Sequence, residues 1–265
     1  MPQANVNGTT VSYTDSGGEG TPVLLLHAFP MNSGMWEPQI DALGDRFRLI
    51  APDLLGFGGS DAPEDRSRYS MDAYADQLAG LLDELGVDRV VLTGLSMGGY
   101  IGFSFLRRHG QRVSALVLAD TRAEADPPEG IEKRTGQQKQ VESEGTGGLI
   151  EALPGALLGA TTRETKLDVV DRARKLMDNP PAGFVGALEA IKNRVDSSDD
   201  AAKVDVPTLV IVGEEDGITP PEAARRLHEL IGGSKLVVIP EAGHLSNIEA
   251  PEAFNGALAE FLNSL

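Results

Sequence analysis

Residues 90–100, Val-Val-Leu-Thr-Gly-Leu-Ser-Met-Gly-Gly-Tyr, constrain this chain more than any other stretch. The stretch opens with an apolar, β-branched run that predicts a buried strand, and a helical pattern follows it. Between them lies a Gly-x-Ser-x-Gly pattern, which is typical of the sharp strand-to-helix turn that projects a nucleophilic serine. Gly94 and Gly98 lack the side chains that would clash across such a turn. We therefore predict that Ser96 is a catalytic nucleophile.

The rest of the chain alternates predicted strands and helices. Residues 6–13 contain Asn7-Gly8, a turn signal that predicts a hairpin of two short antiparallel strands. Apolar runs predict buried strands at 23–26, 47–51, 90–93, 115–119, 208–212 and 235–239. Because helical segments separate the buried strands, we expect an α/β fold with a doubly wound, mostly parallel sheet of eight strands.

One long segment interrupts this alternation after the sixth strand. Residues 121–202 are rich in Gly, Glu, Arg and Pro, with helical patches and no strong strand. The sequence therefore predicts a core domain formed by residues 1–120 and 203–265, with residues 121–202 inserted into it as a helical cap subdomain.

Two loops near the C-terminus supply the partners that a nucleophilic serine needs. Asp216 and His244 each follow a late buried strand. The carboxyl ends of parallel strands meet at one edge of the sheet, so we expect both residues to lie near Ser96. The order Ser96, Asp216, His244 places nucleophile, acid and histidine in one of the known arrangements of such a triad. Asp120 also ends a strand and is the competing acid.

The same chemistry requires backbone amides that stabilise a negatively charged intermediate. We predict that one donor is the backbone amide of Met97, the residue after the serine. The other is the backbone amide of Phe29, in the loop after the strand at 23–26. We expect His27 to brace that loop by hydrogen bonding. The side chains expected to line the substrate pocket are Trp36, Leu157, Leu158 and Phe184.

Composition excludes several other classes of function. The formal charge of −17 disfavours nucleic acid and anionic membranes as partners. The absence of cysteine excludes disulfides and thiolate sites, and the four histidines lack metal-ligand spacing. No apolar run is long enough for a membrane span, and the N-terminus does not look like a secretory signal. We expect a cytoplasmic protein with a small-molecule substrate and no metal or cofactor, either monomeric or homodimeric.

Two motifs make the resemblance to a known family specific. The stretch 94–99, Gly-Leu-Ser-Met-Gly-Gly, and the stretch 51–61, Ala-Pro-Asp-Leu-Leu-Gly-Phe-Gly-Gly-Ser-Asp, resemble those of the α/β-hydrolase superfamily. Within it, the chain is similar to small cofactor-free serine esterases, perhydrolase-type esterases and enol-lactone hydrolases. One departure is His27-Ala28, where the family usually has His-Gly. Alanine tolerates a positive φ poorly, so either this loop uses ordinary backbone geometry or the Phe29 amide is displaced.

The resemblance implies a carboxylesterase that cleaves esters of small to medium acyl chains through an acyl-enzyme. Lactone or enol-lactone hydrolysis and perhydrolysis use the same triad and stay open, and Pro30 beside Phe29 is compatible with perhydrolysis. The sequence shows no basic cluster, which disfavours a strongly anionic substrate such as an enol-lactone. A non-catalytic member of the fold that binds a small molecule is the alternative from another class.

Overall fold

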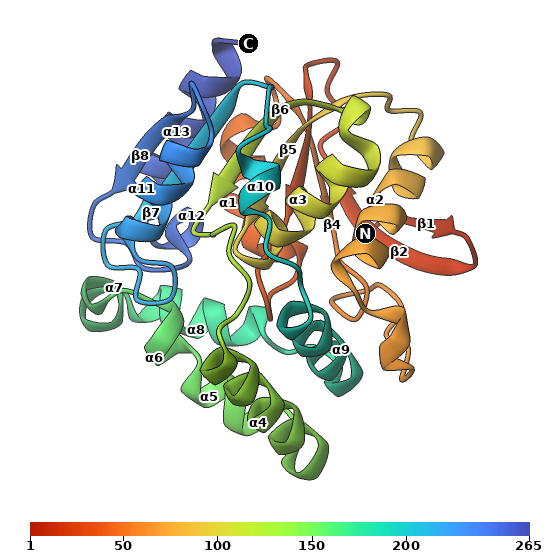
Figure 1. The fold of residues 1–265 in the computed structure, drawn as a ribbon, viewed down its shortest axis with the longest axis vertical. Helices are drawn as coiled ribbons and strands as arrows, with labels where there is room; N and C mark the ends of the chain where they lie inside the picture. Colours follow the sequence, from red (N-terminus) through yellow and green to blue (C-terminus); the bar gives the residue numbers. More distant parts are fainter.

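An eight-stranded sheet lies at the centre of the computed structural model, which describes residues 1–265 (Figure 1). The strands lie side by side in the order β1-β2-β4-β3-β5-β6-β7-β8. Their bounds are β1 (Gln3–Val6), β2 (Thr9–Asp15), β3 (Pro22–Leu26), β4 (Arg48–Pro52), β5 (Val90–Leu95), β6 (Val113–Ala119), β7 (Thr208–Gly213) and β8 (Lys235–Ile239). All pairs among β3–β8 are parallel, whereas β1–β2 and β2–β4 are antiparallel. The prediction of a mostly parallel, eight-stranded α/β sheet is confirmed.

Local sequence explains both the antiparallel hairpin and the buried parallel strands. Asn7 and Gly8 have φ values of 52° and 81°, so the β1–β2 hairpin turns through two left-handed residues, as its Asn-Gly sequence predicts. The central strands β5 and β7 are buried along their whole length. Their continuous apolar runs fit strands that are covered on both faces.

Helices cover both faces of the sheet outside the insert. In β3, Leu24 packs into an apolar cluster with α2 (Met71–Glu84), α3 (Met97–His109) and α11 (Pro221–Leu230). Its neighbour Leu25 packs into a second cluster with α1 (Glu37–Leu43) and α13 (Pro251–Asn263). Successive strand residues point to opposite faces, so the sheet separates two cores. The short elements that complete this part are η1 (Ser33–Trp36), η2 (Arg66–Arg68), η3 (Gly110–Arg112) and α12 (Ser246–Glu249).

The segment between β6 and β7 is helical and contains no strand. Its helices are α4 (Pro128–Glu144), α5 (Gly147–Ala152), α6 (Pro154–Leu157), α7 (Ala160–Thr165), α8 (Leu167–Leu176), α9 (Pro181–Lys192) and α10 (Ser198–Ala201). Figure 1 shows α4–α9 gathered at one end of the sheet. This agrees with the helical pattern predicted for the insert. It stays a prediction that residues 121–202 form a separate subdomain. None of the helices in the protein has both the length and the apolar character needed to cross a membrane.

Close backbone packing joins β3 to the turn after β5. Leu26 lies beside Gly94 in the parallel register, and a Cβ on Gly98 would overlap the Leu26 carbonyl group. The start of α3 therefore lies directly against the end of β3. This contact brings the loop after β3 next to Ser96.

We predict that Gly98→Ala destabilises the fold by about 1–3 kcal/mol, because the added methyl group must push apart two backbone segments. Gly110→Ala is the matched control at the other end of α3, since Gly110 has φ −54° and open space around its Cα. Urea denaturation with equal m-values measures both variants. A midpoint for Gly98→Ala at or above that of the unmodified protein contradicts the prediction.

Candidate active site

Ser96 occupies a strained turn between β5 and α3. Its backbone has φ 55° and ψ −111°, a positive φ that non-glycine residues adopt rarely. The Ser96 amide donates to the Ala119 carbonyl at 2.9 Å, and the Ser96 carbonyl accepts from the Thr121 hydroxyl at 2.8 Å. These bonds to the end of β6 hold the turn in place. The side chain lines a cavity and is 8% exposed.

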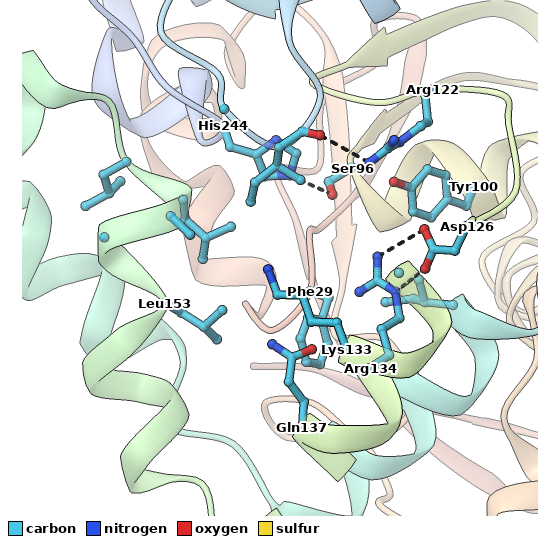
Figure 2. Close-up of a pocket in the computed structure, with 18 of the residues that line it drawn as sticks. Phe29, Ser96, Tyr100, Arg122, Asp126, Lys133, Arg134, Gln137, Leu153 and His244 are labelled. Carbon is cyan, nitrogen blue, oxygen red and sulfur yellow. Dashed lines mark hydrogen bonds and ion pairs between the residues drawn. The ribbon is translucent and has the colours of Figure 1, made fainter. Parts of the chain in front are cut away.

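His244 lies between Ser96 and Asp216, as predicted from their order in the sequence. Its Nε2 is 2.8 Å from Ser96 Oγ, and its Nδ1 is 2.8 Å from Asp216 Oδ2. Figure 2 shows the bond between the imidazole and the serine at the edge of the cavity. With Nδ1 protonated, the ring donates to the carboxylate and accepts the serine hydroxyl. The imidazole is therefore oriented to withdraw a proton from Ser96.

Asp216 is held as an anion by its partners. Its Oδ1 accepts the amides of Ile218 and Thr219 at 2.8 and 2.9 Å, and the Thr219 hydroxyl donates to Oδ2 at 2.7 Å. Burial alone would raise the pKa of this carboxyl, but the charge of His244 and these hydrogen bonds hold the pKa below its usual range.

Asp120, the competing acid, makes no hydrogen bond to His244. Its carboxyl accepts the Gly213 amide at 2.8 Å and the Ser246 hydroxyl. Burial, followed by the nearby negative charge of Asp216, raises the pKa of Asp120 well above its usual value. Its bonds therefore tie the loop that carries Asp216 to the loop that carries His244, and its raised pKa favours the neutral form of the carboxyl. This position agrees with the preference for Asp216 as the acid.

Two backbone amides beside Ser96 are free to bind an anion. Neither the Phe29 amide nor the Met97 amide has a hydrogen-bond acceptor within the protein. Phe29 lines the same cavity as Ser96, whereas the Met97 side chain is fully buried, so Met97 could contribute only its amide. Ala28 does not adopt a positive φ. The loop therefore accommodates alanine with ordinary backbone geometry.

His27 braces this loop from below. Its Nδ1 is 3.0 Å from the Ala28 carbonyl oxygen, and its Nε2 accepts the Leu54 amide at 3.0 Å. Burial lowers the pKa of His27 to about 4, so the ring is neutral near pH 7. His27 therefore has the structural position expected from the sequence.

The cavity at Ser96 has a volume of about 570 Å³, within the range of small-molecule sites. Leu157 and Leu158 line it, as predicted. Trp36 and Phe184 do not, and those two predictions are wrong. Trp36 is fully buried and packs against Phe254 with ring centroids 6.0 Å apart. Phe184 is also fully buried and packs behind Phe29 at 5.5 Å.

The cavity also has a charged wall that the sequence did not predict. Its charged lining residues, apart from His244, are Arg122, Asp126, Lys133, Arg134, Arg163 and Glu215. The sequence has no run of basic residues, but the inference drawn from this, that the site disfavours an anionic substrate, does not fit such a wall. Arg122, Lys133 and Arg134 lie within residues 122–134 and Arg163 comes from the later helix α7, so no run of basic residues marks all four in the sequence. Only the tertiary structure brings them to one wall.

A buried ion cluster organises part of this wall. Asp126 and Arg194 are each 3% exposed in their side chains and pair at 2.9 Å. Arg134 binds the same carboxylate, and the Arg194 guanidinium lies 4.1 Å from the Tyr100 ring centroid. Burial alone would raise the pKa of Asp126, but the two guanidinium groups hold it below its usual value. Figure 2 shows Arg134 turned toward Asp126 beside Tyr100.

Comparisons with known proteins agree with this architecture. A model of the alpha/beta hydrolase fold matches residues 21–251, so the chain belongs to that family. A thermophilic esterase from Thermogutta terrifontis, solved with malate bound, is 38% identical with a TM-score of 0.94, covering 100% of this chain and 99% of that one. The enol-lactonase from Burkholderia xenovorans is 31% identical with a TM-score of 0.91, covering 99% and 100%. A putative non-heme chloroperoxidase from Synechocystis is 32% identical, covering 99% and 100%.

We predict that Asp120→Asn stabilises the protein increasingly as the pH rises above about 4, where this carboxyl ionises in the unfolded chain. The folded state keeps the Asp120 proton that the unfolded state releases, so this group makes stability fall with rising pH. Asparagine has no such proton and can preserve the bonds to Gly213 and Ser246.

The measurement is the free energy of unfolding of both proteins by urea between pH 4 and pH 8. The difference between variant and unmodified protein should grow by up to about 1 kcal/mol per pH unit until the folded carboxyl ionises. A difference that is constant over this range would show that Asp120 is ionised in the folded protein.

Proposed function

We propose that this protein is a serine hydrolase that cleaves carboxylic esters of small to medium acyl chains through an acyl-enzyme. The observation that carries this proposal is the hydrogen-bonded series Ser96–His244–Asp216 at the edge of a cavity of about 570 Å³. A protein that only binds a small molecule has no need of such a series. Turnover, rather than binding alone, is therefore the function we expect.

In the acylation step, His244 Nε2 accepts the Ser96 proton while Oγ attacks the ester carbonyl carbon. Asp216 keeps the imidazole in the required tautomer and stabilises the imidazolium. The amides of Phe29 and Met97 bind the oxyanion of the tetrahedral intermediate, each contributing about 3–4 kcal/mol by analogy with measured sites. The intermediate collapses, and His244 gives its proton to the departing alkoxide.

In the deacylation step, the same groups act on water. His244 takes a proton from a water molecule that attacks the acyl carbon, and then returns a proton to Ser96 Oγ as the acid product leaves. The residue pair therefore ends the cycle in its starting protonation state. No further acid or base is required.

A second candidate is hydrolysis of a lactone, an ester closed into a ring. The similarity to the Burkholderia xenovorans enol-lactonase over nearly the whole chain favours it. The chemical steps are the same, but the alcohol product stays attached to the acyl group. Perhydrolysis is a third use of the same triad, in which hydrogen peroxide replaces water, and the chloroperoxidase relative makes it worth assaying.

We predict that the protein hydrolyses p-nitrophenyl esters and that Ser96→Ala lowers kcat by about 10⁴-fold or more. Release of p-nitrophenol, measured over acyl chains from acetate to dodecanoate, also sizes the acyl part of the cavity. Unchanged turnover by Ser96→Ala would refute the proposal. If no ester is cleaved, covalent labelling of Ser96 by a phosphonate distinguishes a lactonase with a competent serine from a binding protein.

We also predict that substitutions of the two buried carboxyls lower kcat by very different amounts. Asp216→Asn should lower kcat by about 10⁴-fold, because the amide no longer stabilises the imidazolium or fixes its tautomer. Asp120→Asn should lower kcat by less than about tenfold, because a protonated carboxyl and an amide make similar hydrogen bonds. The measurement is kcat on the best ester from the series. A larger loss for Asp120→Asn than for Asp216→Asn reverses the assignment of the acid.

A further inference from the structure

The charge of the cavity wall is opposite to that of the molecule. The chain carries a formal charge of −17, yet its cavity at Ser96 is lined by four cationic side chains and two anionic ones besides His244. Fixed charges in a cleft act most strongly on what enters it. The wall therefore favours a ligand of negative charge.

Three of the four cations already have partners. Arg134 pairs with Asp126. Arg122 donates to the Ile218 carbonyl at 3.1 Å, and Arg163 donates to the Gly159 carbonyl at 3.4 Å. Glu215 adds a compensating charge near Arg163, although its carboxylate is also bonded to Thr161.

Lys133 differs from these arginines because its ammonium group makes no ion pair and no hydrogen bond within the protein. Gln137 follows it by one turn of α4 and also lines the cavity, and its side-chain amide has no partner either. Figure 2 shows both side chains extending from α4 into the cavity. An ammonium and an amide NH₂ at this spacing present several donors to one acceptor group.

The cavity has polar groups at two opposite sides and apolar side chains along its wall. Figure 2 places Ser96 and His244 on one side of the cavity and Lys133 with Gln137 across it. Apolar side chains, among them Leu153 and Leu157, line the same space. A ligand that matches this wall has an ester carbonyl at one end, a hydrocarbon chain, and an acceptor of negative charge at the other.

We infer that the substrate is an ester with a free carboxylate several carbons from the scissile carbonyl, such as a monoester of a dicarboxylic acid, and that Lys133 and Gln137 bind this carboxylate. The inference rests on the proposed esterase function and adds the class of substrate. Lys133 acts as a specificity residue: it contacts the remote carboxylate and leaves the reacting atoms to Ser96 and His244.

The test compares monomethyl adipate with methyl hexanoate, in which a methyl group replaces the carboxylate. Lys133→Gln should lower the ratio of kcat/KM for the anionic ester over that for the neutral ester by about tenfold or more, the lower end of the range for a hydrogen bond to a charged group. The change should lie in KM, because an interaction remote from the reacting carbon is equally strong in the ground and transition states. Proton release at constant pH measures both esters.

Lys139→Gln is the matched control: Lys139 lies on the same helix, is exposed, and does not line the cavity. It removes the same charge, so it should leave the ratio unchanged. Lys133→Glu should lower the ratio further than Lys133→Gln, and 0.5 M salt should reduce the preference of the unmodified protein, because exposed charges are screened.

An equal ratio in Lys133→Gln and the unmodified protein, or an equal fall in Lys133→Gln and Lys139→Gln, overturns the assignment of Lys133 while the esterase function stands. If the unmodified protein cleaves neither of these two esters nor any p-nitrophenyl ester, the proposed function is refuted instead. This inference then falls with it.

Discussion

The turn at Ser96 is the constraint on which the rest of the site depends. A non-glycine residue with φ 55° costs about 1–3 kcal/mol, and the surrounding backbone maintains it. The bonds to Ala119 and Thr121 hold the turn from the side of β6, and the packing of Gly98 on Leu26 holds it from the side of β3. Because these contacts are with neighbouring strands, the sheet positions the serine hydroxyl more firmly than a surface loop could.

The two buried aspartates show how the environment shifts the pKa values of two identical carboxyl groups in opposite directions. Asp216 has hydrogen-bond donors and the His244 ring around its carboxylate, so its pKa is lowered. Asp120 is fully enclosed next to that charge, so its pKa is raised. Asp216 can therefore act as an anion toward the imidazole, while Asp120, whose neutral form is favoured, links two loops. Such separation of pKa values is a recurring feature of sites that move protons.

The helical insert is joined to the core through the loops of the site itself. The His244 amide donates to the Leu157 carbonyl at 2.9 Å, and Glu215 accepts the Thr161 amide at 2.9 Å. The insert also supplies most of the apolar residues of the cavity wall and the free Lys133. The groups that we propose for chemistry and those that we propose for substrate selection thus belong to different segments that share one hydrogen-bonded boundary.

The sequence by itself determined the class of sheet, the position of the serine turn and the grouping of Ser96, Asp216 and His244. These follow from apolar periodicity and from the parallel topology that brings strand ends to one edge. It could not place Trp36 and Phe184, because an apolar side chain indicates burial but not whether its neighbour is a cavity or another ring. Nor could it reveal the cationic wall, since Arg122, Lys133 and Arg163 are brought together only when separate segments pack over the sheet.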